Sequence, residues 1–129
     1  GEADILLGFE PLETYRAMVK CSANSVVISN NVPIMPFSVA IGKSSYPDIS
    51  KLFDRIRKHV RQLKTLNAQA LAMEAGASLS ANIVMLGALA RSEVLPIPKG
   101  SFQETIRTKT KKQLVDTNLK AFELGYDAS

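Results

Sequence analysis

Acidic and amide side chains follow two short apolar segments near the start of the chain, where they could contact a ligand. Residues 3–9 are almost continuously apolar, and Glu10 follows them directly. A second apolar segment, residues 25–29, ends in Asn30 and Asn31. Ligands of open α/β sheets bind beside the carboxyl ends of the strands, so these three side chains are candidates for a polar contact to a ligand or a subunit. The structural alternatives are helix-start electrostatics for the acid and a fixed turn for the amides.

Two basic segments could meet an anion. Residues 51–64 carry six lysines and arginines against one acid, and residues 99–112 carry five against one, in a chain of net charge +4. The plainer interpretation is that both segments are solvated helix faces. The alternative is an anion-binding surface, for which Arg55 and Lys58 in the first segment are the candidates, followed by Lys111 and Lys112 in the second.

The sequence lacks the usual patterns for nucleotide, hydrolase and metal sites. It contains no GxGxxG, GxxxxGK[ST], GxSxG, HExxH or CxxC. One cysteine, Cys21, and one histidine, His59, are too few for an iron–sulfur cluster or a structural zinc site. We therefore expect Cys21 to be a packing residue, His59 to be exposed, and the setting to be reducing and cytoplasmic. No apolar segment is long enough for a membrane span, so no membrane contact is expected.

The first half of the chain reads as alternating strands and helices. Residues 3–9 are typical of a strand buried on both faces, and Pro11 suits the first turn of the following helix. With residues 25–29 as the next strand, the three elements form a βαβ unit. The pattern predicts further strands at 37–41 and within 61–67.

The amphipathic segment after residues 46–48 predicts a helix with one apolar stripe and a basic remainder. The length fits a single domain over residues 1–129. The predicted fold class is α/β, a three-layer α/β/α arrangement with a mostly parallel or mixed Rossmann-like sheet and a helical C-terminal tail.

The second half is predicted to be helical. Apolar periodicity marks four helices, at 68–75, 83–91, 101–108 and 112–124. Gly76 and Gly125 are placed to end the first and the last of them, and Ser101 with Glu104 has the spacing of a capping box.

Two asparagines stand out in these helices because asparagine is a poor helix former. Asn82 is interpreted as an N-cap of the helix that follows it. Asn118 falls inside the last helix, which predicts either a buried hydrogen bond or a role at an interface.

Residues 3–13, ADILLGFEPLE, resemble the strand–helix start of the gamma component of the 2-oxoacid:ferredoxin oxidoreductases. Within that family the resemblance is strongest to the beta subunits of the indolepyruvate or arylpyruvate type. Further matches keep the family's order: Asn30, Pro36, Tyr46-Pro47, Ala72, Glu74-Ala75-Gly76, Asn82, Met85-Leu86-Gly87-Ala88, Asn118, Ala121-Phe122 and Gly125. Family members begin with a glycine-rich βα unit, which this chain does not contain, so it resembles their C-terminal portion.

The resemblance implies a subunit of a complex that oxidatively decarboxylates 2-oxoacids to acyl-CoA with ferredoxin as acceptor. Thiamine diphosphate and the iron–sulfur clusters are expected in a catalytic alpha-type partner subunit and none in this chain, which would be structural or CoA-covering and inactive in isolation. Ferredoxin would be an indirect partner and CoA a co-substrate. A sheet without its first strand would expose an apolar edge, which favours either that partner or a homo-oligomer.

A second hypothesis of another class remains open. The chain could be a small basic α/β module that binds nucleotide or RNA through its two basic segments, although the resemblance argues against nucleic acid. Steep loss of affinity with rising salt would identify such a module. The candidate cofactor-binding residues are Glu10, Asn30, Asn31, Arg55 and Lys58, whereas a nucleic acid would bind through residues 51–64 and 99–112.

Overall fold

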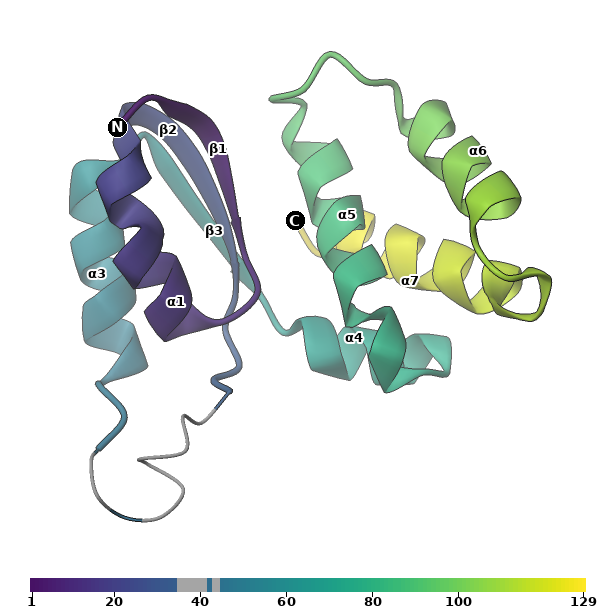
Figure 1. Cartoon of the computed structure of the whole chain (residues 1–129), viewed down its shortest axis with the longest axis horizontal. Coiled ribbons are helices and arrows are strands. Elements are labelled where there is room, and N and C mark those ends of the chain that lie inside the picture. Colours follow the sequence, from purple (N-terminus) through teal and green to yellow (C-terminus); the bar gives the residue numbers. More distant parts are fainter. Residues whose placement is uncertain (35–41, 43–44) are drawn as a thin grey trace. The chain divides into compact units, whose positions relative to one another are not determined.

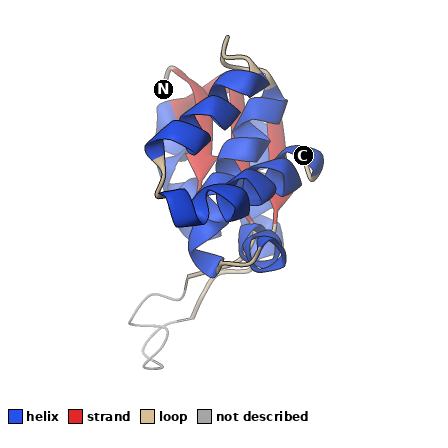
Figure 2. Cartoon of the chain, turned by 90° about the vertical axis from the view of Figure 1, so that its right-hand side faces the viewer, coloured by secondary structure: helices blue, strands red, loops and turns tan. Residues whose placement is uncertain are grey.

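The computed structural model describes residues 1–34, 42 and 45–129, which form two compact units. Unit 1 is Gly1–Leu63 and unit 2 is Lys64–Ser129. Helix is the commonest secondary structure in the described residues (Figure 2). The predicted strand at 37–41 lies outside the described residues. In the part of the chain that is described, no helix combines the length and the apolar character that crossing a membrane requires.

Three strands form the sheet, in the order β1-β2-β3 (Figure 1): β1 (Ala3–Gly8), β2 (Cys21–Asn30) and β3 (Gln62–Leu66). The boundary between the units falls within β3. β1 and β2 run parallel, with Leu6 opposite Val27. The crossover between them consists of α1 (Pro11–Arg16) and the 3-10 turn η1 (Ala17–Lys20). The predicted βαβ unit is therefore confirmed.

The first strand is confirmed, but its predicted burial on both faces is wrong. Asp4 is exposed, and Leu6 and Leu7 are only half-buried. The reason is that β1 lies at the edge of the described sheet, whereas β2 lies at its centre and buries residues 25–30. β2 is also longer than predicted, because its pairing with β1 starts at Cys21 and resumes after an irregularity.

Helix α3 (Ile49–His59) packs with α1 over one face of the sheet (Figure 1). Asp48 caps α3, because its Oδ1 accepts a hydrogen bond from the backbone N–H of Lys51 at 3.3 Å. The predicted apolar stripe is buried and joins a cluster with side chains of α1, η1 and β2: Val27, Phe53, Ile56 and Val60, with Tyr15 and Met18 half-buried against them. The basic residues of α3 are left on its other sides.

Unit 2 is helical apart from the end of β3. Its elements are α4 (Ala68–Ala75), the 3-10 turn η2 (Ser78–Ser80), α5 (Ala81–Ser92), α6 (Lys99–Lys109), the 3-10 turn η3 (Lys112–Leu114) and α7 (Val115–Asp127). Gly76 ends α4 in a left-handed conformation with φ of 117°, as predicted, and its N–H bonds back to the carbonyls of Ala72 and Met73. The α/β class, the parallel β1–β2 pair and the helical C-terminal region are thus confirmed. The predicted third layer stays a prediction.

Helices α5 and α7 cross at two glycines. A Cβ on Gly125 would overlap the carbonyl oxygen of Val84, and a Cβ on Gly87 would overlap that of Phe122. The prediction that Gly125 ends the last helix is therefore wrong, since α7 continues to Asp127. The glycine serves the close approach of the two backbones instead of a left-handed cap.

Two predicted caps are also wrong. Asn82 lies inside α5, where its Oδ1 contacts the N–H of the next residue, and the N-cap position is Ser80. Ser101 and Glu104 form no capping box, because α6 already begins at Lys99 after Pro98. Pro98 occupies the N-cap position, so the helix begins about one turn earlier than the Ser–Glu spacing indicates.

Candidate functional site

Glu10 is the centre of a hydrogen-bond network at the carboxyl end of β1. It is the N-cap residue of α1, and only 6% of its surface is exposed. Its Oε1 accepts hydrogen bonds from the backbone N–H groups of Leu12 and Glu13, the latter at 3.0 Å. A carboxylate in this position satisfies N–H groups that the helix leaves without a partner and lies at the positive end of the helix dipole.

The second oxygen of Glu10 is also occupied. Its Oε2 accepts hydrogen bonds from the hydroxyl of Tyr46 at 2.8 Å and from the N–H of Ile34 at 3.3 Å. Burial and the hydrogen bond to Glu10 raise the pKa of Tyr46 to about 12. Both oxygens therefore have two internal donors each, which favours the structural interpretation of Glu10. Tyr46 was not among the candidates, because 36 residues separate it from Glu10 and no periodic pattern links them.

Asn30 lies beside this network, as the sheet-edge argument predicted. Its Nδ2 donates to the carbonyl oxygen of Phe9 at 3.2 Å and so ties the end of β2 to the end of β1. The hydroxyl of Thr14 on α1 donates a hydrogen bond to the Glu10 carbonyl oxygen at 2.6 Å and lies 3.0 Å from the hydroxyl of Ser29 on β2. Asn30 thus fixes the strand ends.

Asn31 directly follows β2 and is half-buried. Its side chain makes no hydrogen bond with a described residue. A pocket of about 270 Å³ is lined by residues of β1 and α1 and by Glu10. Leu6, Leu7 and the half-exposed Phe9 contribute to its mainly apolar lining.

Arg55 and Lys58 lie on the exposed side of α3, and no hydrogen bond or ion pair joins them to Glu10 or Asn30. Neither forms an ion pair with a described residue, whereas Arg57 on the same helix pairs with Asp54 at 3.2 Å. His59 is exposed, as predicted, and its Nδ1 lies 2.8 Å from the Arg55 carbonyl oxygen. The structure therefore brings Glu10 and Asn30 together and leaves the two basic candidates on a separate surface.

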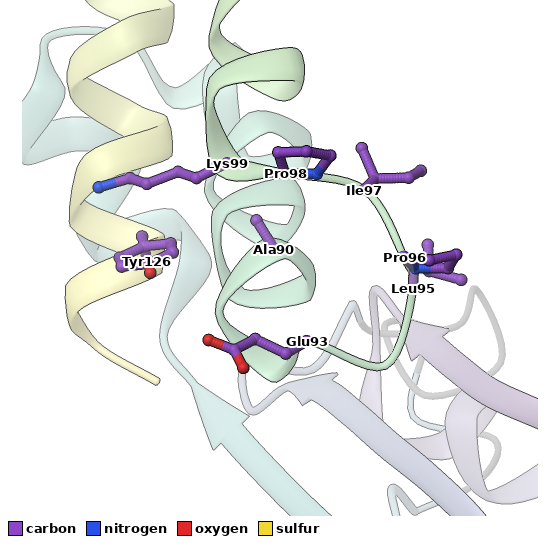
Figure 3. Close-up of a pocket in the computed structure, with 8 residues that line it drawn as sticks. All are labelled: Ala90, Glu93, Leu95, Pro96, Ile97, Pro98, Lys99 and Tyr126. Atoms are coloured by element: carbon purple, nitrogen blue, oxygen red, sulfur yellow. The ribbon is translucent and has the colours of Figure 1, made fainter.

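A second pocket, of about 330 Å³, lies in unit 2 beside Tyr126 (Figure 3). The Lys99 side chain extends from the start of α6 to α7, where its Nζ lies 3.9 Å from the Tyr126 ring centroid and 2.9 Å from a Glu123 oxygen. The Arg91 guanidinium lies 5.2 Å from the same ring centroid. These cations are already engaged in cation–π and ionic contacts that join α5, α6 and α7.

The residues of this chain do not fit an iron–sulfur cluster. Cys21 is half-buried and packs against the apolar cluster of unit 1. Across residues 1–34, 42 and 45–129, no three His, Cys, Asp or Glu side chains lie close enough to share a metal ion. A cluster held by about four cysteines has no ligand set here.

A family model described as pyruvate ferredoxin/flavodoxin oxidoreductase matches residues 1–128. Indolepyruvate oxidoreductase subunit IorB of Methanothermobacter thermautotrophicus is 37% identical over 129 residues, which are 100% of this chain and 66% of that protein. IorB of Thermococcus kodakarensis is 34% identical over 134 residues, covering 100% of this chain and 64% of the relative. The chain thus spans less than two thirds of the length of these relatives.

The fold is shared with a solved structure. The gamma subunit of a keto/oxoacid ferredoxin oxidoreductase from Geobacter sulfurreducens superimposes with a TM-score of 0.66 at 19% identity. The match covers 98% of this chain and 63% of that subunit. At this identity the likeness is one of fold.

Proposed function

Because the chain belongs to the pyruvate ferredoxin/flavodoxin oxidoreductase family, we propose that it is a non-catalytic subunit of a 2-oxoacid:ferredoxin oxidoreductase of the indolepyruvate or arylpyruvate type. The observation that carries the proposal is the 37% identity to an IorB subunit over the full length of this chain. In the proposed complex a 2-oxoacid is oxidatively decarboxylated, ferredoxin accepts the electrons and an acyl-CoA is formed. Residues 1–129 act as one gamma-type domain.

The chemistry of the complex is assigned to a catalytic alpha-type partner subunit in the cytoplasm. Thiamine diphosphate and the iron–sulfur clusters belong to that partner, and the single cysteine of this chain supports the assignment of the clusters, which take about four cysteines. This chain contributes structure and covers CoA. Ferredoxin is reduced by the partner and meets this chain only indirectly.

Co-purification tests the proposed partnership. A tagged alpha-type subunit of an indolepyruvate oxidoreductase, co-expressed with this chain under anoxic conditions, should retain it through size-exclusion chromatography. The matched control is the tagged subunit with an unrelated basic α/β domain of similar size, which should separate. Elution of this chain by itself, or with nucleic acid, would overturn the proposal.

Arg55 and Lys58 are the residues that we propose to face CoA. Both are exposed on α3 without an ion-pair partner among the described residues, so their charge is available to a phosphate. In the reconstituted complex, Arg55→Gln with Lys58→Gln should raise the KM for CoA by about tenfold or more, equivalent to about 1.4 kcal/mol, with kcat unchanged.

The control for this experiment is Arg57→Gln, which removes one positive charge from the same helix, from a residue already paired with Asp54. It should change the KM for CoA little. Lys111→Gln with Lys112→Gln tests the second basic segment in the same assay. Unchanged CoA dependence in both double variants would refute the CoA-covering role while leaving the subunit assignment intact.

The exposed basic face of α3 also keeps the nucleotide- or RNA-binding hypothesis testable. Such a module would bind RNA with a log affinity that falls linearly with log salt, in proportion to the number of neutralised phosphates. We expect this chain not to bind RNA with such a salt-dependent affinity.

A further inference from the structure

A third pocket, of about 380 Å³, lies within unit 2 and involves none of the residues discussed for CoA except Lys111. It is bounded on one side by η2 and the start of α5, and on the other by the connection from α6 through η3 to α7. Its walls are mainly apolar, with contributions from Leu79, Ile83 and Leu114. Ligand pockets commonly combine such apolar walls with a few placed polar groups.

Asn118 is one of the polar residues that line this pocket. Only 7% of its surface is exposed, and its Oδ1 accepts a hydrogen bond from the Ser80 hydroxyl at 2.8 Å. With the amide assigned in this orientation, its Nδ2 makes no hydrogen bond with a described residue. Among the described residues every fully enclosed side-chain nitrogen or oxygen has a partner, so Nδ2, which has none, is accessible to solvent, and Asn118 is one of the residues that line the pocket. An amide N–H in so buried a position gains from an acceptor.

The charge at the pocket rim also favours an acceptor. Lys109 and Lys111 contribute to the lining, and neither ammonium group forms a salt bridge with a described residue. None of the described residues that line the pocket is acidic. An anion that enters would meet positive charge at the rim and an amide donor at the wall.

Apolar surface surrounds these donors. Leu79 is 93% exposed and Leu114 is 41% exposed, although both are large hydrophobic residues. A ligand with an apolar body would cover them and gain about 25 cal/mol for each Å² removed from water.

From these four observations we infer that the pocket binds a small organic acid with an aliphatic or aromatic body. The carboxylate accepts the hydrogen bond from Asn118 Nδ2 and lies within the field of Lys109 and Lys111. The apolar body packs against Leu79 and Leu114. This binding site is independent of the proposed subunit function, because all of its groups belong to this chain.

The test is an NMR titration of the ¹⁵N-labelled full chain with 3-phenylpropionate. Saturable shift changes should gather at residues 79–83 and 110–118, with a dissociation constant in the millimolar range or below. The neutral analogue 3-phenylpropanamide should bind more weakly by about tenfold. Equal binding of acid and amide, or no saturation by the acid at its solubility limit, would overturn the inference.

Variants localise the carboxylate. Asn118→Asp keeps an oxygen for the Ser80 hydroxyl but replaces the amide N–H₂ with a second carboxylate oxygen, so binding of the acid should be lost. Lys109→Gln with Lys111→Gln changes only exposed residues and should weaken binding by about tenfold, whereas Lys120→Gln on α7 should not. If Asn118→Asp fails to fold, the lysine variants decide, and unchanged affinity in them contradicts the assignment.

A carboxylate could also come from a polypeptide C-terminus, which the titration distinguishes. The blocked peptide Ac-Ala-Ala-Leu with a terminal carboxylate presents the same group on a chain. It should bind no more tightly than 3-phenylpropionate. Binding that is tighter by about tenfold or more would replace the free acid with a chain terminus as the ligand.

Discussion

Glu10 in unit 1 and Asn118 in unit 2 are both buried polar side chains, and the structure treats them differently. Each Glu10 oxygen accepts two hydrogen bonds from the protein itself. Asn118 uses one end of its amide on Ser80 and presents the other to a pocket. A buried group with complete internal pairing stabilises the fold, whereas a group that keeps an accessible donor can also bind a ligand.

The comparison shows why a position at the carboxyl end of a strand is, by itself, a weak indication of a ligand-binding site. The carboxyl ends of β1 and β2 do bring Glu10 and Asn30 together, as topology predicts. A ligand would need Glu10 Oε2 and Asn30 Nδ2, but these atoms already form hydrogen bonds with Tyr46, Ile34 and Phe9.

The largest effect is expected where unit 2 depends on close helix packing. Gly125→Ala places a Cβ on the Val84 carbonyl oxygen and should destabilise the chain by about 3 kcal/mol or prevent folding. Urea unfolding measures the change. Gly100→Ala is the matched control, because a Cβ there meets nothing within 4 Å in the exposed part of α6, and it should stabilise by about 0.5–1 kcal/mol. Tolerance of Gly125→Ala would contradict the α5–α7 crossing.

The second largest effect is expected from the hydrogen-bond network centred on Glu10 in unit 1. Glu10→Ala removes the cap of α1 and leaves the Tyr46 hydroxyl and Ile34 N–H without their acceptor, so it should cost about 2 kcal/mol. Glu13→Ala on the same helix removes only an exposed ion pair with Arg16 and should cost less than about 0.5 kcal/mol. Equal losses in the two variants would show that the network does not stabilise unit 1.

The third prediction concerns how the stabilising effect of the Tyr46–Glu10 hydrogen bond depends on pH. Tyr46 has a pKa raised from 10.0 to about 12 in the folded chain, so the fold favours its protonated form. Its contribution is complete below pH 10 and is lost as the pH rises towards 12. Tyr46→Phe should cost about 1 kcal/mol at neutral pH.

The matched comparison is between the parent chain and Tyr46→Phe across this alkaline range, where lysines titrate in both. The difference in unfolding free energy between the two should shrink from pH 10 to 12. A difference that stays constant would contradict the pairing of the Tyr46 hydroxyl with Glu10.

Most elements of this fold follow from local sequence. Residues 49–60 show their buried stripe within one helix, and Gly76 ends α4 because a left-handed cap is a local requirement. Gly125 was wrongly predicted to end α7, because the residue that requires a glycine there, Val84 on α5, lies some forty residues earlier in the chain. The Tyr46–Glu10 bond was missed for the same reason. Asn118 was noticed because a poor helix former inside a helix needs a tertiary explanation.

The smallest effect concerns the pocket itself. Ser80→Ala and Asn118→Ala each remove one side of a single hydrogen bond, and a double-mutant cycle should give a coupling of about 1 kcal/mol. The cost of Asn118→Ala should be below that of Glu10→Ala, because fewer internal bonds are lost. The reverse order, measured by urea unfolding, would show that Asn118 is held by the fold as firmly as Glu10.

The most direct test of the subunit proposal is a reconstitution assay. Under anoxic conditions, the alpha-type subunit with this chain should reduce ferredoxin in a reaction that depends on an arylpyruvate and on CoA, and this chain by itself should turn over neither substrate. Restored activity on addition of this chain would establish it as a non-catalytic subunit. Turnover of an arylpyruvate by the isolated chain, or no effect of the chain on the partner, would contradict the account.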